Sequence, residues 1–369
     1  LLTLLGSLGI FLFGMKMMSE ALQKIAGNRL RRILSAMTAT RYYGIFAGFL
    51  VTGLVQSSSA VTVMLVSFVN AGLISLEGSI AVVMGANIGT TVTAWLVALF
   101  GFTFSISSIA LPLIGLTIPL LFSRKGNRRA WGEFVLGFAL LFTGLQFMKN
   151  MFPELRESVE SYEFLYGYTD MGYGSVILFV GIGMVITVII QSSSATMALT
   201  IVLADAGLIP YDLAAAMILG ENIGTTVTAN IAAAVANVSA KRTARAHFII
   251  NVIGVSWMLL IFYPFLGLID RVFMLAVQVP VFDPVLPVTP EAREYLPLGL
   301  AAFHSLFNIL NVIFLSFILG SIATMSRYLV RRQDGHEEFS IRPIKTGLVS
   351  LSELSMLEAR QSIAQMGGI

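Results

Sequence analysis

The sequence contains no cysteine and few charged side chains. With no Cys among its 369 residues, the chain can form neither a disulfide framework nor a thiolate metal site, and its redox compartment stays open. Lys, Arg, Asp and Glu together make up 12% of the positions, and the formal net charge is +3. That balance is too small to indicate nucleic-acid binding, so no nucleic-acid partner is expected.

Apolar residues fill the chain instead. They occupy 56% of the positions, and the mean hydropathy is +0.85, outside the range of soluble domains. Runs such as 176–190 and 306–322 approach the ~20 residues that a helix needs to cross a bilayer. The predicted fold class is therefore an all-α membrane protein, with the lipid bilayer as its surroundings.

The start of the chain, LLTLLGSLGIFLFGM, has no initiator methionine and no basic segment before a cleavage site. The helical pattern continues past Gly14. We interpret this segment as a first membrane helix with a trimmed start, rather than as a signal peptide.

Two polar motifs occur twice within these apolar surroundings. QSSSA begins at Gln56 and again at Gln191, and NIGTT begins at Asn87 and again at Asn222, so both pairs are 135 residues apart. Without a gap, 19 of the 39 positions from Gln56 to Ala94 are identical in the second copy, and the polar and glycine positions agree best. The sequence therefore contains an internal repeat that carries a site.

Each copy is expected to contain five elements. A long opening helix is suggested by a loose match between LFGMKMM (12–18) and LFTGLQFMKNM (141–151). Two apolar arms around QSSSA, a helix through NIGTT and a closing helix follow. The expected domains are a first transmembrane repeat (1–123), a second, inverted repeat (124–267), an outside loop with an additional transmembrane helix (268–330) and a cytoplasmic tail (331–369).

Charge alternates between the segments that join the apolar runs. Because cytoplasmic segments are rich in Lys and Arg, the basic segments are assigned to the cytoplasm, together with the C-terminus. Five elements per unit then make the two units cross the membrane in opposite senses, and the arms around QSSSA must form re-entrant hairpins. The basic residues are Lys24, Arg29, Arg31, Arg32, Arg41, Arg124, Lys125, Arg128, Arg129, Lys241, Arg242, Arg245, Arg327, Arg331 and Arg332; the acidic ones are Glu154, Glu157, Glu160, Glu163, Asp170, Asp283, Glu291 and Glu294.

Both motifs place polar groups and irregular backbone at membrane depth, where lipid cannot satisfy them. Serines at a helix start cap free N–H groups, and the helix dipole favours an anion there. NIGTTVT combines a glycine that lets the helix open with threonine oxygens that, with freed carbonyls, could hold a small cation. Inverted repeats with interrupted helices are typical of secondary transporters, although small and hydroxyl residues also serve helix packing.

QSSSA followed 31 residues later by NIGTT, twice, resembles the type II sodium/phosphate cotransporter family, especially its bacterial members, over roughly residues 1–325. The resemblance implies no enzyme and no organic cofactor, but sodium-coupled transport of inorganic phosphate by alternating access in a bacterial plasma membrane. It implies a phosphate region at Gln56, Ser57, Ser58, Ser59, Gln191, Ser192, Ser193 and Ser194, to which we add Asn87 and Asn222. For sodium it implies Gln191, Ser192, Thr225, Thr228 and Thr90, to which we add Glu221.

Glu221 departs from the family's pattern, and its repeat counterpart is Ala86. An ionisable side chain in a membrane segment is costly and is a functional hypothesis in itself. Its carboxylate, next to Asn222, is a candidate sodium ligand or proton site, so stoichiometry and coupling ion stay open.

Two further features resemble parts of related proteins. His247 and Asn251, like His304 and Asn308, form H-x-x-x-N pairs that resemble a helix near the core of this family, with helix pairing as the alternative. The tail has a capping box at Ser350 and Glu353 before an amphipathic pattern, which resembles the start of a PhoU-like regulatory domain. A PhoU-like cytoplasmic partner and a homodimer stay open.

Other functions remain as alternatives. Hydroxyl and backbone donors do not by themselves distinguish phosphate from sulfate or a carboxylate, and sodium coupling does not forbid net phosphate export. An intramembrane serine hydrolase would need one nucleophile, with His247 or His304 as base, rather than two symmetric copies.

Overall fold

The computed structural model describes residues 2–27, 29–30, 33, 40–104, 106–156, 168–282 and 290–331, and this part of the chain is helical with no strand. The chain divides into Leu1–Arg332 and Gln333–Ile369. Several predictions fall outside the described residues: the tail with its capping box, the charges at Arg31, Arg32, Glu157, Glu160, Glu163, Asp283 and Arg332, and the side chains of Glu154 and Glu291.

Six helical spans of the described residues are long and apolar enough to cross a membrane, which confirms the predicted fold class. They are Leu2–Ala26, Leu76–Thr103, Gly126–Met151, Tyr173–Ile190, Val238–Leu260 and Ala292–Phe317. Shorter apolar helices lie between them, among them both arms of the first QSSSA motif and the arm that follows the second, whereas the arm before the second motif is the span Tyr173–Ile190.

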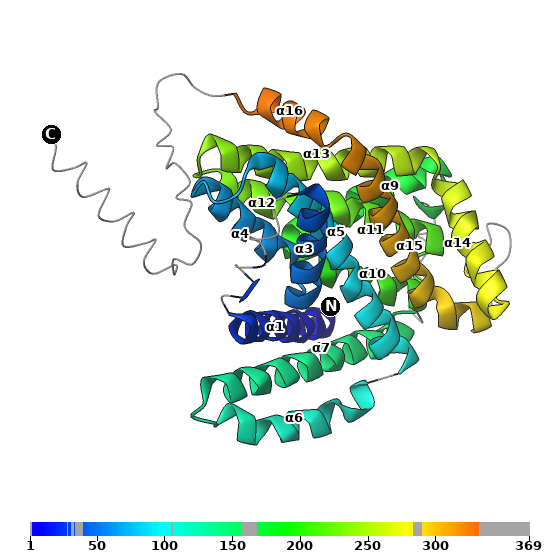
Figure 1. Ribbon diagram of the computed structural model, residues 1–369. Coiled ribbons are helices and arrows are strands. Elements are labelled where there is room, and N and C mark those ends of the chain that lie inside the picture. Colours follow the sequence, from blue (N-terminus) through cyan, green and yellow to red (C-terminus); the bar gives the residue numbers. More distant parts are fainter. Residues whose placement is uncertain are drawn as a thin grey trace. The chain divides into compact units, whose positions relative to one another are not determined.

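The opening helices of the two sequence copies pack against each other. α1 (Leu2–Ala26) runs antiparallel to α7 (Gly126–Arg156), with α6 (Ser107–Leu121) on the other side of α7 (Figure 1). A Cβ atom on Gly14 would lie only 2.7 Å from the Gly137 carbonyl oxygen, so glycine lets these backbones touch. At one end of the pair, Lys24 Nζ lies 2.7 Å from Glu133 Oε2.

Each QSSSA motif joins two helices. The first joins α3 (Arg41–Val55) to α4 (Ser58–Asn70), and the second joins α9 (Tyr173–Ile190) to α10 (Ser193–Asp205). α4 and α10 begin and end at positions 135 residues apart. The two hairpins also pack in the same way against the helix that follows each of them. A Cβ atom on Gly48 would overlap the Val82 carbonyl oxygen, and a Cβ atom on Gly183 would overlap the Met217 carbonyl oxygen. The structure thus has two similar helical hairpins, each packed against the helix that follows it.

The NIGTT segments differ between the copies. α11 (Tyr211–Gly224) and α12 (Thr226–Ala233) are separated only by Thr225, which keeps a helical conformation (φ −59°, ψ −24°) and whose backbone amide donates to the Glu221 carbonyl (3.0 Å), whereas α5 (Leu76–Leu96) is continuous through the first copy. The Thr90 hydroxyl donates to the Ala86 carbonyl one turn earlier (3.0 Å), whereas the Thr225 hydroxyl has no partner. The predicted break in the first NIGTT is therefore wrong. The irregularity lies further on, in the π-helix η1 (Val97–Thr103).

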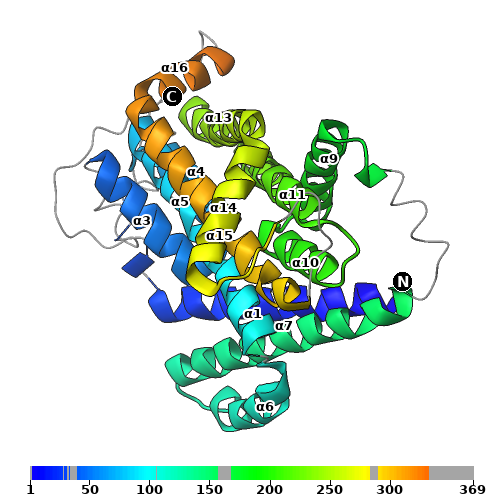
Figure 2. The same cartoon turned by 90° about the vertical axis from the view of Figure 1, so that its right-hand side faces the viewer.

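The remaining helices complete the bundle (Figure 2). α13 (Val238–Leu260) lies beside α5, with Ser79 2.9 Å from Thr243 and Asn87 3.2 Å from Asn251 through their side chains. Because both partners advance by eight residues, α5 and α13 run in the same direction. α14 (Phe262–Val277), α15 (Pro290–Phe317) and α16 (Leu319–Leu329) follow, so the boundary expected at 267 lies within α14.

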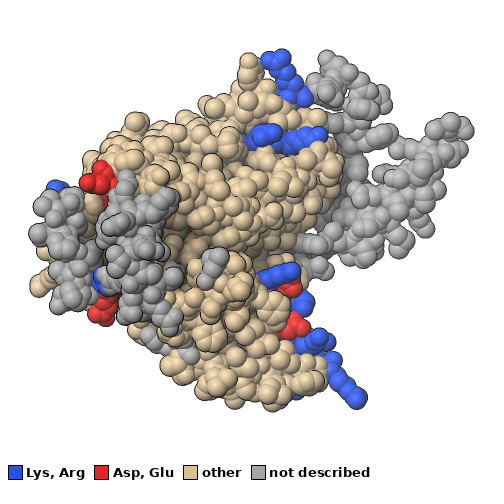
Figure 3. Space-filling view, turned by 180° about the vertical axis from the view of Figure 1, so that it is seen from behind, with Lys and Arg blue, Asp and Glu red and all other residues tan. Residues whose placement is uncertain are grey.

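Charge is distributed unevenly over the surface. In Figure 3 most of the visible Lys and Arg side chains lie toward the right-hand end of the molecule. The basic run between α6 and α7, with Arg124, Lys125, Arg128 and Arg129, is exposed. This arrangement agrees with the sequence pattern from which the cytoplasmic side is assigned.

Candidate functional site

The first QSSSA motif makes a sharp turn between two helices. α3 ends because the backbone of Gln56 adopts a left-handed conformation (φ 58°). The backbone amide of Gln56 donates to the Thr52 carbonyl (2.7 Å). Ser57 is extended and caps α4, its Oγ accepting from the Ala60 amide at 3.2 Å. The amides at the start of α4 are thereby directed toward the turn.

The second motif repeats this geometry residue by residue. Gln191 has φ 57°, and its amide donates to the Thr187 carbonyl (2.8 Å). Ser192 caps α10 and accepts from the Ala195 amide at 3.2 Å. A non-glycine residue in the left-handed region costs ~1–3 kcal/mol and is concentrated at functional sites. Two equivalent glutamines that both adopt it indicate that the turn itself is required.

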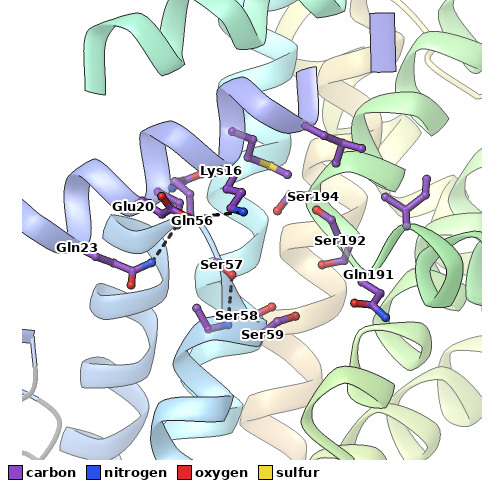
Figure 4. A pocket seen from close by; sticks show the side chains of 16 residues that line it. Lys16, Glu20, Gln23, Gln56, Ser57, Ser58, Ser59, Gln191, Ser192 and Ser194 are labelled. Atoms are coloured by element: carbon purple, nitrogen blue, oxygen red, sulfur yellow. Dashed lines mark hydrogen bonds and ion pairs between the residues drawn. The ribbon is translucent and has the colours of Figure 1, made fainter. Parts of the chain in front are cut away.

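Both turns open into the same cavity, which has a volume of about 450 Å³ and is lined by the sixteen side chains drawn in Figure 4. The structure brings together eight of the ten residues expected for phosphate: Gln56, Ser57, Ser58, Ser59, Gln191, Ser192, Ser193 and Ser194. This size suits a small-molecule site. Two helix N-termini face the cavity, each with a partial positive charge and amide donors, so the cavity is suited to an anion.

Thr93 of α5 connects the two turns and was missed by the sequence analysis. Its hydroxyl donates to Gln56 Oε1 (2.9 Å) and lies 3.3 Å from Ser194 Oγ, and the side chain is buried. The internal repeat could have indicated Thr93, because it lies 135 residues before Thr228, which the family resemblance places at sodium. Thr93 therefore fixes the spacing between the two turns.

The two motif asparagines do not line the cavity. Asn87 Nδ2 donates to Asn251 Oδ1 of α13, and Asn222 Nδ2 donates to the Ile218 carbonyl (2.8 Å). Both side chains are buried. In this arrangement they contact neighbouring helices or their own backbone instead of the space between the turns.

Of the six residues expected for sodium, Glu221, Thr225 and Thr228 lie at the junction between α11 and α12, Gln191 and Ser192 line the cavity, and Thr90 lies on α5. Glu221 is buried, with Oε1 accepting from the Thr200 hydroxyl (2.7 Å) and Oε2 without a hydrogen-bond partner. Thr225 is buried with an unpartnered hydroxyl, and Thr228 is half-buried. Two buried side-chain oxygens without a hydrogen-bond partner, Glu221 Oε2 and Thr225 Oγ1, are therefore available to a cation at this junction. No cluster of three or more His, Asp or Glu suited to a metal ion occurs among the described residues.

The histidines of the H-x-x-x-N pairs are buried away from the cavity. His247 and His304 are 1% and 3% exposed, and neither belongs to the cavity lining. Asn251 and Asn308 each donate to the carbonyl of the preceding histidine (2.9 Å). Neither of these two histidines therefore lines the cavity in which the QSSSA serines meet.

α1 supplies part of the lining that the sequence analysis did not identify. Leu12, Met15, Lys16, Ser19, Glu20 and Gln23 lie along the cavity. The only sequence signal was the loose LFGMKMM match, and it did not indicate which face of the helix would meet the two turns.

Comparison with known proteins agrees with this geometry. The profile of the Na+/Pi-cotransporter family matches residues 10–150 and 170–274. The chain is 32% identical to the uncharacterized protein YqeW of Bacillus subtilis over 251 residues, or 68% of this chain and 78% of YqeW. It is 28% identical to the putative inorganic phosphate export protein YjbB of Salmonella typhimurium over 272 residues, or 73% of this chain and 48% of YjbB.

A shorter match reaches an animal protein. The human sodium-dependent phosphate transport protein 2B is 39% identical over 101 residues, which are 27% of this chain and 15% of that protein. The chain spans about half the length of the YjbB relatives, and no solved structure matches it. The profile covers well over half of the chain, and together with six apolar spans and a cavity between two QSSSA turns it shows that this multi-pass membrane protein belongs to the Na+/Pi-cotransporter family.

Proposed function

We propose that this protein moves inorganic phosphate across a bacterial plasma membrane, coupled to sodium, with the anion held between the two QSSSA turns. The observation that carries the proposal is the shared cavity, into which the starts of both α4 and α10 open. A tetrahedral oxyanion there would receive serine hydroxyls and helix-start amides from both sides. Such charge-assisted hydrogen bonds are roughly twice as strong as neutral ones.

The directions of the helices support inverted repeats. The first copy closes with α6 and the second with α13, and α6 is the element that follows α5 and η1 along the chain. If each closing helix runs back against the NIGTT helix before it and both copies had the same orientation, α13 would run opposite to α5. Instead α5 and α13 run in parallel, as inversion requires. An inverted pair of hairpins around one central cavity is suited to alternating access.

Sodium is proposed to bind between the second turn and the junction of α11 with α12, through oxygens of Gln191, Ser192, Thr225 and Thr228 with Glu221 nearby. A cation there would lie within the field of the phosphate and would offset its charge. The unpartnered oxygens of Glu221 and Thr225 support this assignment, because buried polar atoms rarely lack a partner. Thr90, whose hydroxyl bonds its own helix, is the weakest of these candidates.

The net direction of phosphate transport is a separate question. Because the YjbB relatives are named as putative phosphate exporters, both uptake and export should be measured. The same cavity serves import or export, since the gradients set the net flux. The basic segments place the C-terminus in the cytoplasm under this proposal.

Purified protein in proteoliposomes tests the function. We expect uptake of radiolabelled phosphate to rise under an inward sodium gradient relative to potassium, and to reverse with the gradient. Excess sulfate should inhibit little if phosphate is the substrate. Sodium-independent flux would remove the coupling from the proposal, and strong competition by sulfate would indicate a broader oxyanion carrier.

A further inference from the structure

One face of α1 covers the cavity, and it carries charge. Its lining residues, Leu12, Met15, Lys16, Ser19, Glu20 and Gln23, recur at the three- and four-residue spacing of a single helix face. Lys16 and Glu20 are the charged residues among the described side chains that line the cavity. The two QSSSA turns themselves offer only neutral donors and helix dipoles.

α1 is fixed in place beside the first turn. The buried Ser19 hydroxyl donates to the carbonyl of Val55, the last residue of α3 (2.7 Å), and Gln23 Nε2 donates to Ser19 Oγ (3.3 Å). Lys16 lies one helical turn before Ser19, and in Figure 4 its side chain extends between α1 and the two turns. The position of this ammonium group near the serines therefore depends on a specific contact.

The Lys16 ammonium group is available to a ligand. Its Nζ lies 3.9 Å from Glu20 Oε1, and the two side chains are 74% and 53% exposed. At 3.9 Å the pair is too long for a hydrogen bond, and exposed pairs contribute little stability. A lysine near the middle of an apolar helix is costly unless it meets water or a partner, so its position indicates a function.

Lys149, the counterpart of Lys16 in the second opening helix, contacts other groups. In the match of LFGMKMM with LFTGLQFMKNM, Lys149 stands at the place of Lys16. Lys149 donates to the Gly101 carbonyl (3.2 Å) and lies 4.0 Å from the centre of the Phe102 ring. It is not among the residues lining this cavity.

We propose that Lys16 is the charged contact for the transported oxyanion, and that Glu20 is its counterion while the site is empty. The inference rests on the proposed function, because it assumes that the anion occupies the cavity between the turns. On binding, the oxyanion takes the ammonium group and Glu20 turns back to water. A neutral or cationic solute gains nothing from Lys16, so this pair selects for anions.

The test uses four variants of the whole chain in proteoliposomes at saturating sodium. Lys16→Gln should raise the KM for phosphate about tenfold, equivalent to about 1.4 kcal/mol, whereas Lys16→Arg should stay near the wild type. Glu20→Gln removes a competing anion and should lower the KM. The matched control is Lys24→Gln, which removes the same charge from the same helix two turns away, where Lys24 pairs with Glu133, and its KM should not change.

Equal KM values for Lys16→Gln and Lys24→Gln would overturn the inference, as would an Arg variant as impaired as the Gln variant. If the wild type carries no phosphate at all, the proposed function fails, and binding then tests Lys16 on its own. The melting temperature of the detergent-solubilised protein should rise with added phosphate in the wild type and in Lys24→Gln, whereas Lys16→Gln should need about tenfold more phosphate for the same rise. An equal rise in both variants, or none in the wild type, would contradict the role of Lys16.

Discussion

Replacing Thr93 by valine should separate the two turns that form the cavity. The Thr93 hydroxyl is the described group that touches both Gln56 Oε1 (2.9 Å) and Ser194 Oγ (3.3 Å), and the side chain is 3% exposed. Valine keeps the shape but removes both contacts. Each hydrogen bond contributes ~1 kcal/mol net, and a buried oxygen left unpaired costs ~1–3 kcal/mol. Because Gln56 lines the cavity and water there can partly replace the lost contact, we expect the free energy of unfolding to fall by about 1–2 kcal/mol.

The loss should appear in binding as well as in stability. A misplaced turn presents its backbone amides at the wrong distance, so the KM for phosphate should rise about five- to thirtyfold if the whole of this free energy is lost from binding. Thr93→Ser retains the hydroxyl and should stay close to the wild type.

Thr91→Val is the matched control, since that buried hydroxyl on the same helix bonds only the Ile88 carbonyl (2.8 Å). Phosphate concentration curves in proteoliposomes and melting curves in detergent measure both effects. If Thr91→Val and Thr93→Val raised the KM equally, the bridging role of Thr93 would be refuted.

Three further predictions follow from other parts of the structure. Glu221→Gln should fold, because it retains an acceptor for Thr200, yet weaken the sodium dependence of flux and flatten its pH profile; wild-type sodium and pH curves would make Glu221 a packing residue. Gly48→Ala and Gly183→Ala should each lower the melting temperature, at a cost of ~1–3 kcal/mol for overpacking, whereas Gly181→Ala, with open space around its Cβ position, should not; tolerance at Gly48 and Gly183 would contradict the close helix packing. Single substitutions Asn127→Cys and Asp170→Cys, both at exposed positions of a Cys-free chain, should react with an impermeant thiol reagent from opposite sides of the membrane, and labelling from one side would rule out the inverted arrangement.

The polar motifs allowed much of the fold and part of the site to be predicted. Two QSSSA copies in register predicted two helical hairpins, and α4 and α10 do begin at Ser58 and Ser193. Serine at a helix start is a local signal, because the hydroxyl caps amides three residues away. The meeting of Gln56 with Gln191 at one cavity was expected from the family resemblance, and the structure brings them together.

What depended on tertiary contacts could not be predicted. NIGTT has the same sequence in both copies, yet the Thr90 hydroxyl bonds its own helix backbone and the Thr225 hydroxyl has no partner. The face of α1 that meets the cavity depends on Ser19 reaching Val55, a contact between residues 36 positions apart. Asn87 was assigned to phosphate from its motif, and its partner Asn251 lies 164 residues away.

The central claim is that both QSSSA turns hold one phosphate ion in a sodium-dependent way. Single substitutions Ser59→Cys and Ser193→Cys place one thiol in each half-buried turn, and the rate of their modification by a small charged thiol reagent can be measured in proteoliposomes. We predict that phosphate together with sodium slows modification at both positions, that phosphate in potassium does so much less, and that the exposed control Arg128→Cys is unaffected. Protection at only one turn, or protection that does not depend on sodium, would contradict the account.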